Sequence, residues 1–468
     1  MMWLGRTQHV HFVGIGGIGM SGIAELLVNV GYRVSGSDTR HSEITARLST
    51  LGVRVDRGHD AHHADEADVV VVSSAVTPDN PEVLAARERH VPVIPRAEML
   101  AELMRLRIGI AIGGAHGKTT TTSMVALLLE QAGLDPTAVI GGKLSAFGSN
   151  ARLGRGQYMV AEADESDRSF LKLTPTLAVI TNIDHEHMEA YGSFDRLVDA
   201  FRDFADRVPF YGAVVACVDD AAVRDLLPRI TRRVITYGFH PEASVRGVDP
   251  TGDGVSSRCG LAYHVHGIPA GTGTGTIALQ VPGRHNLQNA LAAVAVGLEI
   301  GVPVERALAA LAGFRGADRR YQHRGTAAGV TVVDDYGHHP TEIAAVLQAA
   351  GDGRPSRLVA VFQPHRYSRT RDCLHQFGPA LAAADRVVLT DIYAAGEPPI
   401  DGISLETLAD AIRPHVRALD LAPNLDDLPD IVAREARPGD LVITLGAGSI
   451  AGVGDRILDA LRAQEGQA

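Results

Sequence analysis

Short, fully apolar runs alternate along this chain with segments in which apolar residues recur every three or four positions. The runs at 69–72, 108–112 and 441–445 contain almost no polar side chain. Such runs lack the alternation of a half-exposed strand and are typical of parallel strands that are buried on both faces. The periodic segments at 20–30 and 124–129 predict helices between the strands. The pattern therefore predicts an α/β protein with mostly parallel sheets.

Three stretches each show this alternation, and the length of 468 residues fits about three domains at roughly 150 residues per domain. We expect an N-terminal Rossmann-like domain at 1–106, a central domain resembling P-loop ATPases at 107–322 and a C-terminal Rossmann-like domain at 323–468. The Gly-Thr repeat at 271–276 predicts a flexible hairpin or loop.

A glycine cluster follows the first predicted strand. Gly14, Gly16, Gly17 and Gly19 lie between the apolar residues 9–13 and the first helical pattern. The next predicted strand ends at Ser37 and Asp38, where an acidic side chain can meet a ribose. This order predicts a nucleotide site. It does not separate a dinucleotide from a UDP compound, because both present a pyrophosphate to a helix N-terminus.

A second glycine cluster, Gly113-Gly114-Ala115-His116-Gly117-Lys118-Thr119-Thr120, follows the apolar run at 108–112. Lys118 is one of only three lysines among 44 basic residues, so a lysine here suggests chemistry. Backbone N–H groups and an ammonium bind phosphates, and a Thr hydroxyl can bind Mg²⁺. The segment predicts an ATP site of a shortened type, because Ile112 replaces the first glycine of the full pattern. The strands at 158–162 and 177–182 should end at the same crevice.

Composition excludes several other classes of function. The hydrophobic fraction of 45% and charged fraction of 21% are those of a globular protein. A net charge of -11 argues against nonspecific nucleic-acid binding. Three distant cysteines, Cys217, Cys259 and Cys373, indicate neither a disulfide framework nor a zinc site. No apolar run is long enough for membrane insertion, so we expect a soluble, cytoplasmic protein.

Five motifs together resemble the Mur ligase family, and its alanine-adding branch in particular, over essentially the whole chain. They are Gly14–Gly22, Gly114–Thr121, Glu162–Asp167, Asp334–Pro340 and Gln363–Tyr367. The resemblance implies an ATP-dependent amide ligase of peptidoglycan precursor synthesis with domains for a UDP-substrate, for ATP and for an amino acid. Its substrates would be UDP-N-acetylmuramate and L-alanine, and its cofactors ATP and Mg²⁺. We expect a monomer or a weak homodimer.

The implied reaction has two steps. ATP phosphorylates the muramyl carboxylate to an acyl phosphate, and the amine of L-alanine then displaces phosphate. The alternative is a murein peptide ligase, which attaches a recycled tripeptide to the same UDP-sugar. An NAD-dependent oxidoreductase, suggested by the N-terminal glycines alone, leaves Lys118 unexplained.

The resemblance also assigns residues to roles. The catalytic groups would be Lys118, Glu162, His187, Arg320, His338 and Arg366. ATP would be bound by Gly114, Ala115, His116, Gly117, Lys118, Thr119, Thr120, His285, Asn286, Asn289, Arg320 and Asp335, with metal ligands Thr119, Glu162 and His187. The UDP-substrate would be bound by Gly16, Gly17, Ile18, Gly19, Ser37, Asp38, Ser73 and Asn150, and the amino acid by Tyr336, His338, Arg366 and Arg369.

Some positions depart from the family pattern or stay open. Ala115 stands where the phosphate loop usually has Thr, and Glu186 and Glu189 flank the His-Met pair where Asp is commoner. No lysine lies near Ala200, where several sibling ligases carry a carbamylated lysine, and this favours the alanine-adding branch. Structural alternatives remain for six side chains near the predicted sites. Glu165 and Asp167 can be turn-capping charges, His185 can be structural or a metal ligand, and His59, His62 and His63 are expected in a solvated loop.

Overall fold

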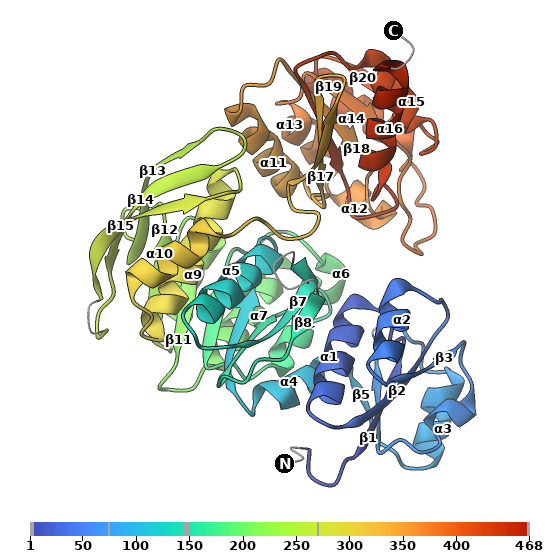
Figure 1. Cartoon of the computed structure of the whole chain (residues 1–468), viewed down its shortest axis with the longest axis vertical. Helices are drawn as coiled ribbons and strands as arrows, with labels where there is room; N and C mark the ends of the chain where they lie inside the picture. The colour runs from blue at the N-terminus through green and yellow to red at the C-terminus, as the bar shows by residue number, and fades with distance from the viewer. Residues whose placement is uncertain (1–3, 74, 145–148, 269–270, 466–468) are drawn as a thin grey trace. The chain divides into compact units, whose positions relative to one another are not determined.

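The computed structural model describes residues 4–73, 75–144, 149–268 and 271–465. It contains three sheets, which are mostly parallel, and so confirms the predicted three-part α/β fold (Figure 1). Two compact units can be separated by their internal contacts. Unit 1 comprises Met1–Val248, Gly260–Ile277 and Gln288–Phe314, and unit 2 comprises Asp249–Cys259, Ala278–Leu287 and Arg315–Ala468.

The N-terminal sheet has five parallel strands in the order β3-β2-β1-β4-β5. Its strands are β1 (His9–Val13), β2 (Arg33–Asp38), β3 (Arg54–Arg57), β4 (Val69–Val72) and β5 (Val93–Pro95). The helices are α1 (Ile18–Asn29), α2 (Glu43–Thr50), η1 (Ala61–Ala64), α3 (Pro81–Glu88) and α4 (Arg96–Met104).

Alternate residues of β1 face opposite layers of this sheet. Val10 and Phe12 pack in the same cluster as Ile23 and Leu27 of α1. Val13 packs instead in the cluster that contains residues of η1 and α3. Because successive side chains of a strand point to opposite faces, the polar residues at 9 and 11 lie on the α3 face. Figure 1 shows α1 and α3 on the two sides of the sheet.

The central sheet has ten strands in the order β15-β14-β13-β12-β11-β10-β6-β9-β7-β8. These are β6 (Ile108–Gly113), β7 (Thr137–Leu144), β8 (Ser149–Arg152), β9 (Tyr158–Glu162), β10 (Leu177–Ile180), β11 (Ala213–Cys217), β12 (Val234–Gly238), β13 (Val245–Gly252), β14 (Ser257–His264) and β15 (Thr272–Leu279). The helices that belong to it are α5 (Lys118–Gln131), η2 (Ser169–Lys172), α6 (Met188–Tyr191), α7 (Phe194–Asp206), α8 (Ala221–Leu226), η3 (Leu227–Arg229), α9 (Arg284–Glu299) and α10 (Val304–Ala312). The repeat predicted as a flexible hairpin or loop lies largely in β15, an edge strand whose threonines suit a half-exposed sheet.

In the middle of this sheet, β6 is flanked by the parallel strands β10 and β9. Ile180 pairs with Gly113, and Glu162 pairs with Ile112. The three strands therefore end at the same level of the sheet, where β6 continues into the second glycine cluster. This register places the predicted phosphate loop beside Glu162.

The C-terminal sheet has the order β16-β17-β21-β18-β19-β20, with only β16 antiparallel to its neighbour. Its strands are β16 (Gln322–Ala327), β17 (Val330–Asp335), β18 (Arg357–Phe362), β19 (Arg386–Leu389), β20 (Leu419–Leu421) and β21 (Asp440–Leu445). Its helices are α11 (Pro340–Asp352), α12 (Tyr367–Asp372), η4 (Leu374–Gln376), α13 (Phe377–Leu381), α14 (Leu405–Ile412), η5 (Arg413–His415), α15 (Leu428–Glu435) and α16 (Val453–Glu465).

Two separate apolar clusters cover the faces of the C-terminal sheet. Residues of α11, α13 and α14 pack on one face. Residues of α15 and α16 pack on the other, as Figure 1 shows. The sheet is thus buried on both sides, as its apolar strands predict. Within the described part of the chain, every helix is too short or too polar to cross a bilayer.

Candidate active site

The phosphate loop connects β6 to α5 in the central sheet. Gly114 has φ of 135°, and a Cβ on it would lie 2.0 Å from Thr181 Oγ1. Gly117 has φ of 81° and would place a Cβ 2.6 Å from Asn289 Oδ1. Both positions therefore require glycine. The loop ends at the N-terminus of α5, where free backbone N–H groups and the helix dipole favour a phosphate.

The end of β10 holds the phosphate loop in place. The Ala115 N–H donates to the Asn182 carbonyl at 3.2 Å, and the His116 N–H donates to Asn182 Oδ1 at 2.8 Å. The Thr181 hydroxyl donates to the His116 carbonyl at 2.7 Å. The convergence of strand ends on this loop is therefore present in the structure.

Lys118 points back over the loop toward the segment after β9. Its Nζ donates to the carbonyls of Gly114 at 2.6 Å and Ala115 at 3.0 Å, and to Glu165 Oε1 at 2.9 Å. The Glu165 side chain is only 2% exposed. Burial raises the pKa of Glu165 to about 7, against the opposing effect of the Lys118 ammonium. Burial opposes the charge on Lys118 too, but the carboxylates of Glu165 and Asp164 outweigh it and raise its pKa.

A group of metal-ligating side chains lies beside this ion pair. Ligand atoms of Glu165, Glu186 and His187 all lie within 4.8 Å of one another. His187 has a left-handed backbone with φ of 56° and is the N-cap of α6. Its Nε2 lies 3.9 Å from Glu165 Oε1 and 4.0 Å from Glu186 Oε2.

The group fits a divalent cation. Glu165 Oε2 is buried and makes no hydrogen bond to any residue that the structure describes. A buried oxygen without a donor is a ready ligand, and carboxylate oxygens are the atoms that Mg²⁺ prefers. Of the three predicted metal ligands, only His187 is in this group. Glu162 lies at the end of β9, and Thr119 lies in the first turn of α5.

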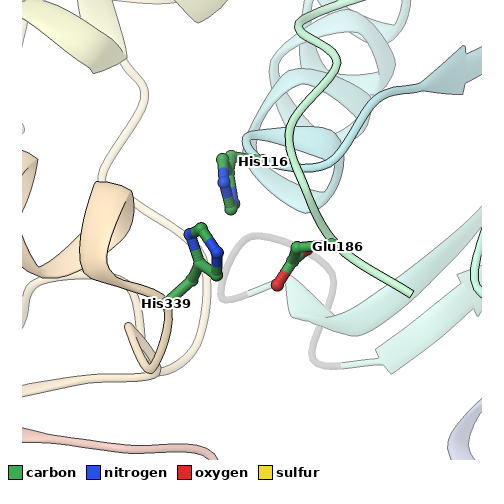
Figure 2. Close-up of side chains that lie close together, drawn as sticks. All are labelled: His116, Glu186 and His339. Carbon is green, nitrogen blue, oxygen red and sulfur yellow. The ribbon is translucent and has the colours of Figure 1, made fainter. Parts of the chain in front are cut away.

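His116, in the phosphate loop, lies close to Glu186 of the metal-ligating group. Its Nε2 lies 2.9 Å from Asp184 Oδ2, which fixes the ring beside the phosphate loop. Figure 2 shows the ring of His116 and the carboxylate of Glu186, both from unit 1. His339, drawn in the same figure, belongs to unit 2, where its Nε2 lies 3.7 Å from Cys373 Sγ.

The structure separates the alternatives left open near this loop. Glu165 is the partner of Lys118 rather than a capping charge. Asp167 is a capping residue, because its Oδ1 accepts from the Ser169 N–H at 2.9 Å. His185 stacks on Phe194 with ring centroids 4.1 Å apart, a structural contact.

The predicted residues of the UDP-substrate site lie at the ends of β1, β2 and β4. The N–H groups of Gly14 and Ile15 donate to the Ser37 carbonyl at 2.9 and 3.0 Å. The Gly16 N–H donates to Asp38 Oδ2 at 2.8 Å, so Asp38 also holds the glycine turn. Ser73 is adjacent, with Oγ 3.3 Å from where a Cβ of Gly14 would lie. Gly17 is the N-cap of α1, and Gly19 lies in its first turn. The side chains of Ile18 and Asn150 lie outside the described part.

Arg96 at the start of α4 was missed in the sequence. Its Nη1 lies 2.9 Å from the position that a Cβ of Gly19 would take. Its Nη2 lies 3.7 Å from Asp164 Oδ2. A guanidinium thus lies beside the N-terminus of α1, 77 residues along the chain from Gly19. The contact that singles out Arg96 is with Gly19, which is distant in the sequence. No local motif could therefore have revealed Arg96.

The predicted adenine-binding residues lie in the first two turns of α9. The Asn286 side chain donates to the Pro282 carbonyl at 2.7 Å. Asn289 lies beside Gly117, next to the phosphate loop. Burial lowers the pKa of His285 to about 4, and the Arg320 guanidinium adds to this effect. His285 is therefore neutral at physiological pH.

Unit 2 places Asp335 at the end of β17, where it holds the following turn. Its carboxylate accepts from the N–H groups of Tyr321 at 2.7 Å and Gly337 at 2.6 Å. Burial raises the pKa of Asp335 to about 6, against the opposing charge of Arg320. The Arg320 guanidinium lies 5.1 Å from the centre of the Tyr336 ring, a cation–π distance.

Three of the four predicted amino-acid residues, Tyr336, His338 and Arg369, lie in a row with His365 in unit 2. The ring of His338 lies 5.3 Å from that of Tyr336 and 5.3 Å from that of His365. Arg369 Nη1 lies 3.2 Å from His365 Nδ1. Burial, His338 and the nearby arginines lower the pKa of His365 to about 3, so this ring is a neutral acceptor. His365 was not among the predicted residues, although it directly precedes Arg366.

Arg366 has an unusual backbone, with φ of 70° and ψ of 141°. Its N–H donates to the Tyr393 carbonyl at 2.8 Å, which holds this conformation. A non-glycine residue in this region is strained, and such strain concentrates at functional sites.

Comparison with known proteins agrees with this architecture. Three family models match the chain: the "Mur ligase family, catalytic domain" at residues 9–107, the "Mur ligase middle domain" at 112–297 and the "Mur ligase, glutamate ligase domain" at 319–448. The three sheets and the phosphate loop thus define a ligase of the Mur type, and the chain belongs to the Mur ligase family.

Several relatives that match almost the whole chain are UDP-N-acetylmuramate–L-alanine ligases. A UDP-N-acetylmuramate–L-alanine ligase of Anaeromyxobacter sp. (strain Fw109-5) is 54% identical over 98% of this chain and 99% of its own. One of Geobacter sp. (strain M21) is 52% identical over the same shares. The solved UDP-N-acetylmuramate-alanine ligase of Thermotoga maritima is 29% identical with a TM-score of 0.81, over 98% of this chain and 99% of its own. A murein peptide ligase of Psychrobacter arcticus 273-4 has a TM-score of 0.71 over 97% of this chain and 99% of its own, and at 24% identity it shows the fold alone.

Proposed function

We propose that this chain joins L-alanine to UDP-N-acetylmuramate with conversion of ATP to ADP and phosphate, a step of peptidoglycan precursor synthesis. The observation that carries the proposal is the Lys118 ammonium, which lies at a phosphate loop between carbonyls and the buried Glu165 carboxylate. Relatives named for this activity are 54% and 52% identical to this chain over almost its whole length, which supports the choice of substrates.

The first step requires a cation at the transferred phosphoryl group. A carboxylate cannot be attacked directly by an amine, because oxide is a poor leaving group. Transfer of the γ-phosphoryl group to the muramyl carboxylate gives an acyl phosphate, whose leaving group is phosphate. Lys118 binds the β- and γ-phosphates and stabilises the charge that moves between them. The N–H groups at the start of α5 add their dipoles.

Glu165, Glu186 and His187 would hold Mg²⁺, together with Thr119 and Glu162 as predicted ligands. When bound, Mg²⁺ neutralises phosphate charge and so favours transfer to a carboxylate. His187 is an uncommon ligand for this ion, and the two carboxylates supply the oxygens that Mg²⁺ prefers.

The second step takes place at residues of unit 2. Arg366 and Arg369 bind the carboxylate of L-alanine, since a guanidinium offers two parallel N–H donors to it. Tyr336 and His338 pack around the amino acid, and Arg320 meets the γ-phosphate. The neutral amine attacks the acyl carbonyl, the C–N bond forms, and phosphate leaves with the electron pair of the C–O bond.

The proposed domain boundaries are 1–106 for the UDP-substrate, 107–322 for ATP and 323–468 for the amino acid. The glycine turn with Gly16, Gly17 and Gly19 binds the diphosphate, and Ser37, Asp38 and Ser73 lie at the uridine. In the ATP domain, His285, Asn286 and Asn289 bind adenine. Asp335, which lies near the start of the next domain, is a further residue that binds ATP. A cytoplasmic location and a monomer or weak homodimer remain predictions.

The tripeptide-adding reaction is the competing proposal, because its enzymes share this fold. Phosphate release from ATP and UDP-N-acetylmuramate should require L-alanine and should not be supported by the tripeptide. Turnover with the tripeptide and none with L-alanine would favour the murein peptide ligase. NADH binding serves as the control for the oxidoreductase alternative, and we expect none.

A further inference from the structure

A fully buried carboxylate lies in the first turn of α3, beneath the predicted uridine edge. The Glu82 side chain is 0% exposed and accepts from three donors. Its Oε2 lies 2.6 Å from His11 Nε2. Its Oε1 lies 2.8 Å from Ser37 Oγ and 2.7 Å from His59 Nδ1. One side chain thus connects α3 to β1, β2 and the loop that follows β3.

The hydrogen bonds continue across the sheet from His11. His11 Nδ1 and His9 Nε2 each lie 2.8 Å from Ser35 Oγ. His9 Nδ1 in turn lies 2.8 Å from the Glu66 carbonyl. These polar residues occupy positions of β1 and β2 that face α3, where apolar side chains would suffice for packing.

The fully buried Glu82 carboxylate can stay ionised only if hydrogen-bond donors surround it. Burial acts to raise the pKa of Glu82, but the hydrogen bonds from His11, Ser37 and His59 outweigh it and hold the pKa below its usual value. A buried charge without partners is strongly unfavourable, so the network fixes the position of every group that donates to Glu82.

Two of those donors lie at the predicted UDP-substrate edge. The Ser37 carbonyl accepts from Gly14 and Ile15, so the position of Ser37 also sets the glycine turn. His59 is 24% exposed and meets both Glu82 and the solvent. Of the three histidines expected in a solvated loop, His62 is 86% exposed, whereas His59 and His63 are only 24% and 21% exposed and lie against Glu82.

We propose that Glu82 is a positioning residue for the UDP-sugar, acting through Ser37 and His59 on the edge where the uridine binds. This inference rests on the proposed function. Glu82 itself touches no substrate. Its carboxylate orients the Ser37 hydroxyl and the His59 ring, and holds the end of β2 against the glycine turn.

Glu82→Gln tests the proposal with almost no change of shape. The amide nitrogen of Gln cannot accept a hydrogen bond, so at least one buried donor loses its partner, an effect that changes an equilibrium by about tenfold. We expect KM for UDP-N-acetylmuramate to rise about tenfold, with kcat and the KM values for ATP and L-alanine within about twofold. Glu88→Gln, an exposed charge change in the same helix, should leave all four constants unchanged.

An unchanged KM for the UDP-sugar in Glu82→Gln would overturn the inference. So would an equal loss in every constant, because a general weakening of the fold does not select one substrate. Ser37→Ala and the double variant supply the second measurement. If Glu82 acts through Ser37, the fold-change of KM in the double variant is smaller than the product of the fold-changes in the two single variants. Independent, multiplying effects would contradict the proposal.

His59→Ala keeps the test available if Glu82→Gln does not fold, and wild-type KM values in both His59→Ala and Ser37→Ala would overturn the inference. Calorimetric titration with UDP-N-acetylmuramate, without ATP, separates the two proposals. A wild-type chain that neither binds nor turns over this compound contradicts the proposed function. A wild-type chain that does both, beside a Glu82→Gln variant of equal affinity, contradicts only the role of Glu82.

Discussion

Lys118 Nζ lies 2.9 Å from Glu165 Oε1, and both side chains are almost enclosed by the end of the central sheet. In this arrangement the carboxylate holds the ammonium over the phosphate loop. A buried ion pair of this kind is weak support for stability, but it presents a desolvated cation to an incoming phosphate.

Replacing the lysine tests this arrangement directly. We expect Lys118→Ala to lower kcat by about 10²- to 10³-fold, because the charge that moves during phosphoryl transfer loses its cation. Affinity for UDP-N-acetylmuramate, measured by calorimetry, should be retained. Lys172→Ala is the matched control, since Lys172 is 45% exposed and pairs with Glu98. A fully active Lys118→Ala variant would contradict the assignment.

The metal group gives a second prediction. Chelation with EDTA should abolish turnover, and added Mg²⁺ should restore it. In Glu165→Gln and His187→Ala, the Mg²⁺ concentration for half-maximal turnover should rise by about tenfold or more, because each variant removes a ligand. Glu305→Gln makes the same charge change at an exposed side chain of α10, and should have a small effect. Wild-type Mg²⁺ dependence in both variants would argue against this site.

The first sheet and the phosphate loop were predictable because their signals are local. A glycine cluster between an apolar run and a helical pattern fixes the type of loop, and Gly114 and Gly117 take the conformations that only glycine adopts readily. Parallel strands end at one edge, so the approach of Asn182 to the loop also followed from the pattern.

Glu82 and Glu186 were not predictable in the same way. Glu82 looks like an ordinary acidic residue in the first turn of a helix, and its partners His11 and Ser37 are 71 and 45 positions away. Glu186 lies close to Glu165 although the two are 21 positions apart, and the residue after it, His187, is the left-handed N-cap of α6. A sequence pattern carries no information on such distant pairings. The Thr-Gly repeat, predicted as a flexible hairpin or loop, lies largely in β15, which pairs with the preceding strand β14.

Arg366 provides a prediction for the amino-acid site. Lys keeps the charge of Arg366 but loses the planar pair of donors, so Arg366→Lys should raise KM for L-alanine by about tenfold. KM for ATP should change by less than about twofold. Arg371→Lys makes the same change five residues later, in α12, at an exposed residue that pairs with Asp372. Equal effects of the two substitutions would show that Arg366 has no special role.

His285 predicts a pH dependence of stability. Its pKa is lowered to about 4 in the folded protein, against 6.5 for the unfolded chain. Between these values the unfolded state binds more protons, so the free energy of unfolding falls as the pH decreases from about 7 toward 4. We expect the loss between pH 7 and pH 5 to be about 1 to 2 kcal/mol smaller in His285→Gln than in the wild type.

The measurement is urea unfolding of both proteins at the two pH values. His41→Gln, at an exposed position, should keep the wild-type difference. A His285→Gln variant with the same difference would show that this half-buried ring is not the neutral group described above.

The central claim is that the Lys118 site phosphorylates the carboxylate of the UDP-sugar before any amine arrives. Incubation with ATP, Mg²⁺, UDP-N-acetylmuramate and hydroxylamine, without L-alanine, tests it most directly by mass spectrometry. We predict a hydroxamate of the UDP-sugar in amounts equal to the ADP formed, and a rate of hydroxamate formation that is about 10²- to 10³-fold lower with Lys118→Ala. Absence of hydroxamate from a preparation that forms the alanine amide would contradict the account.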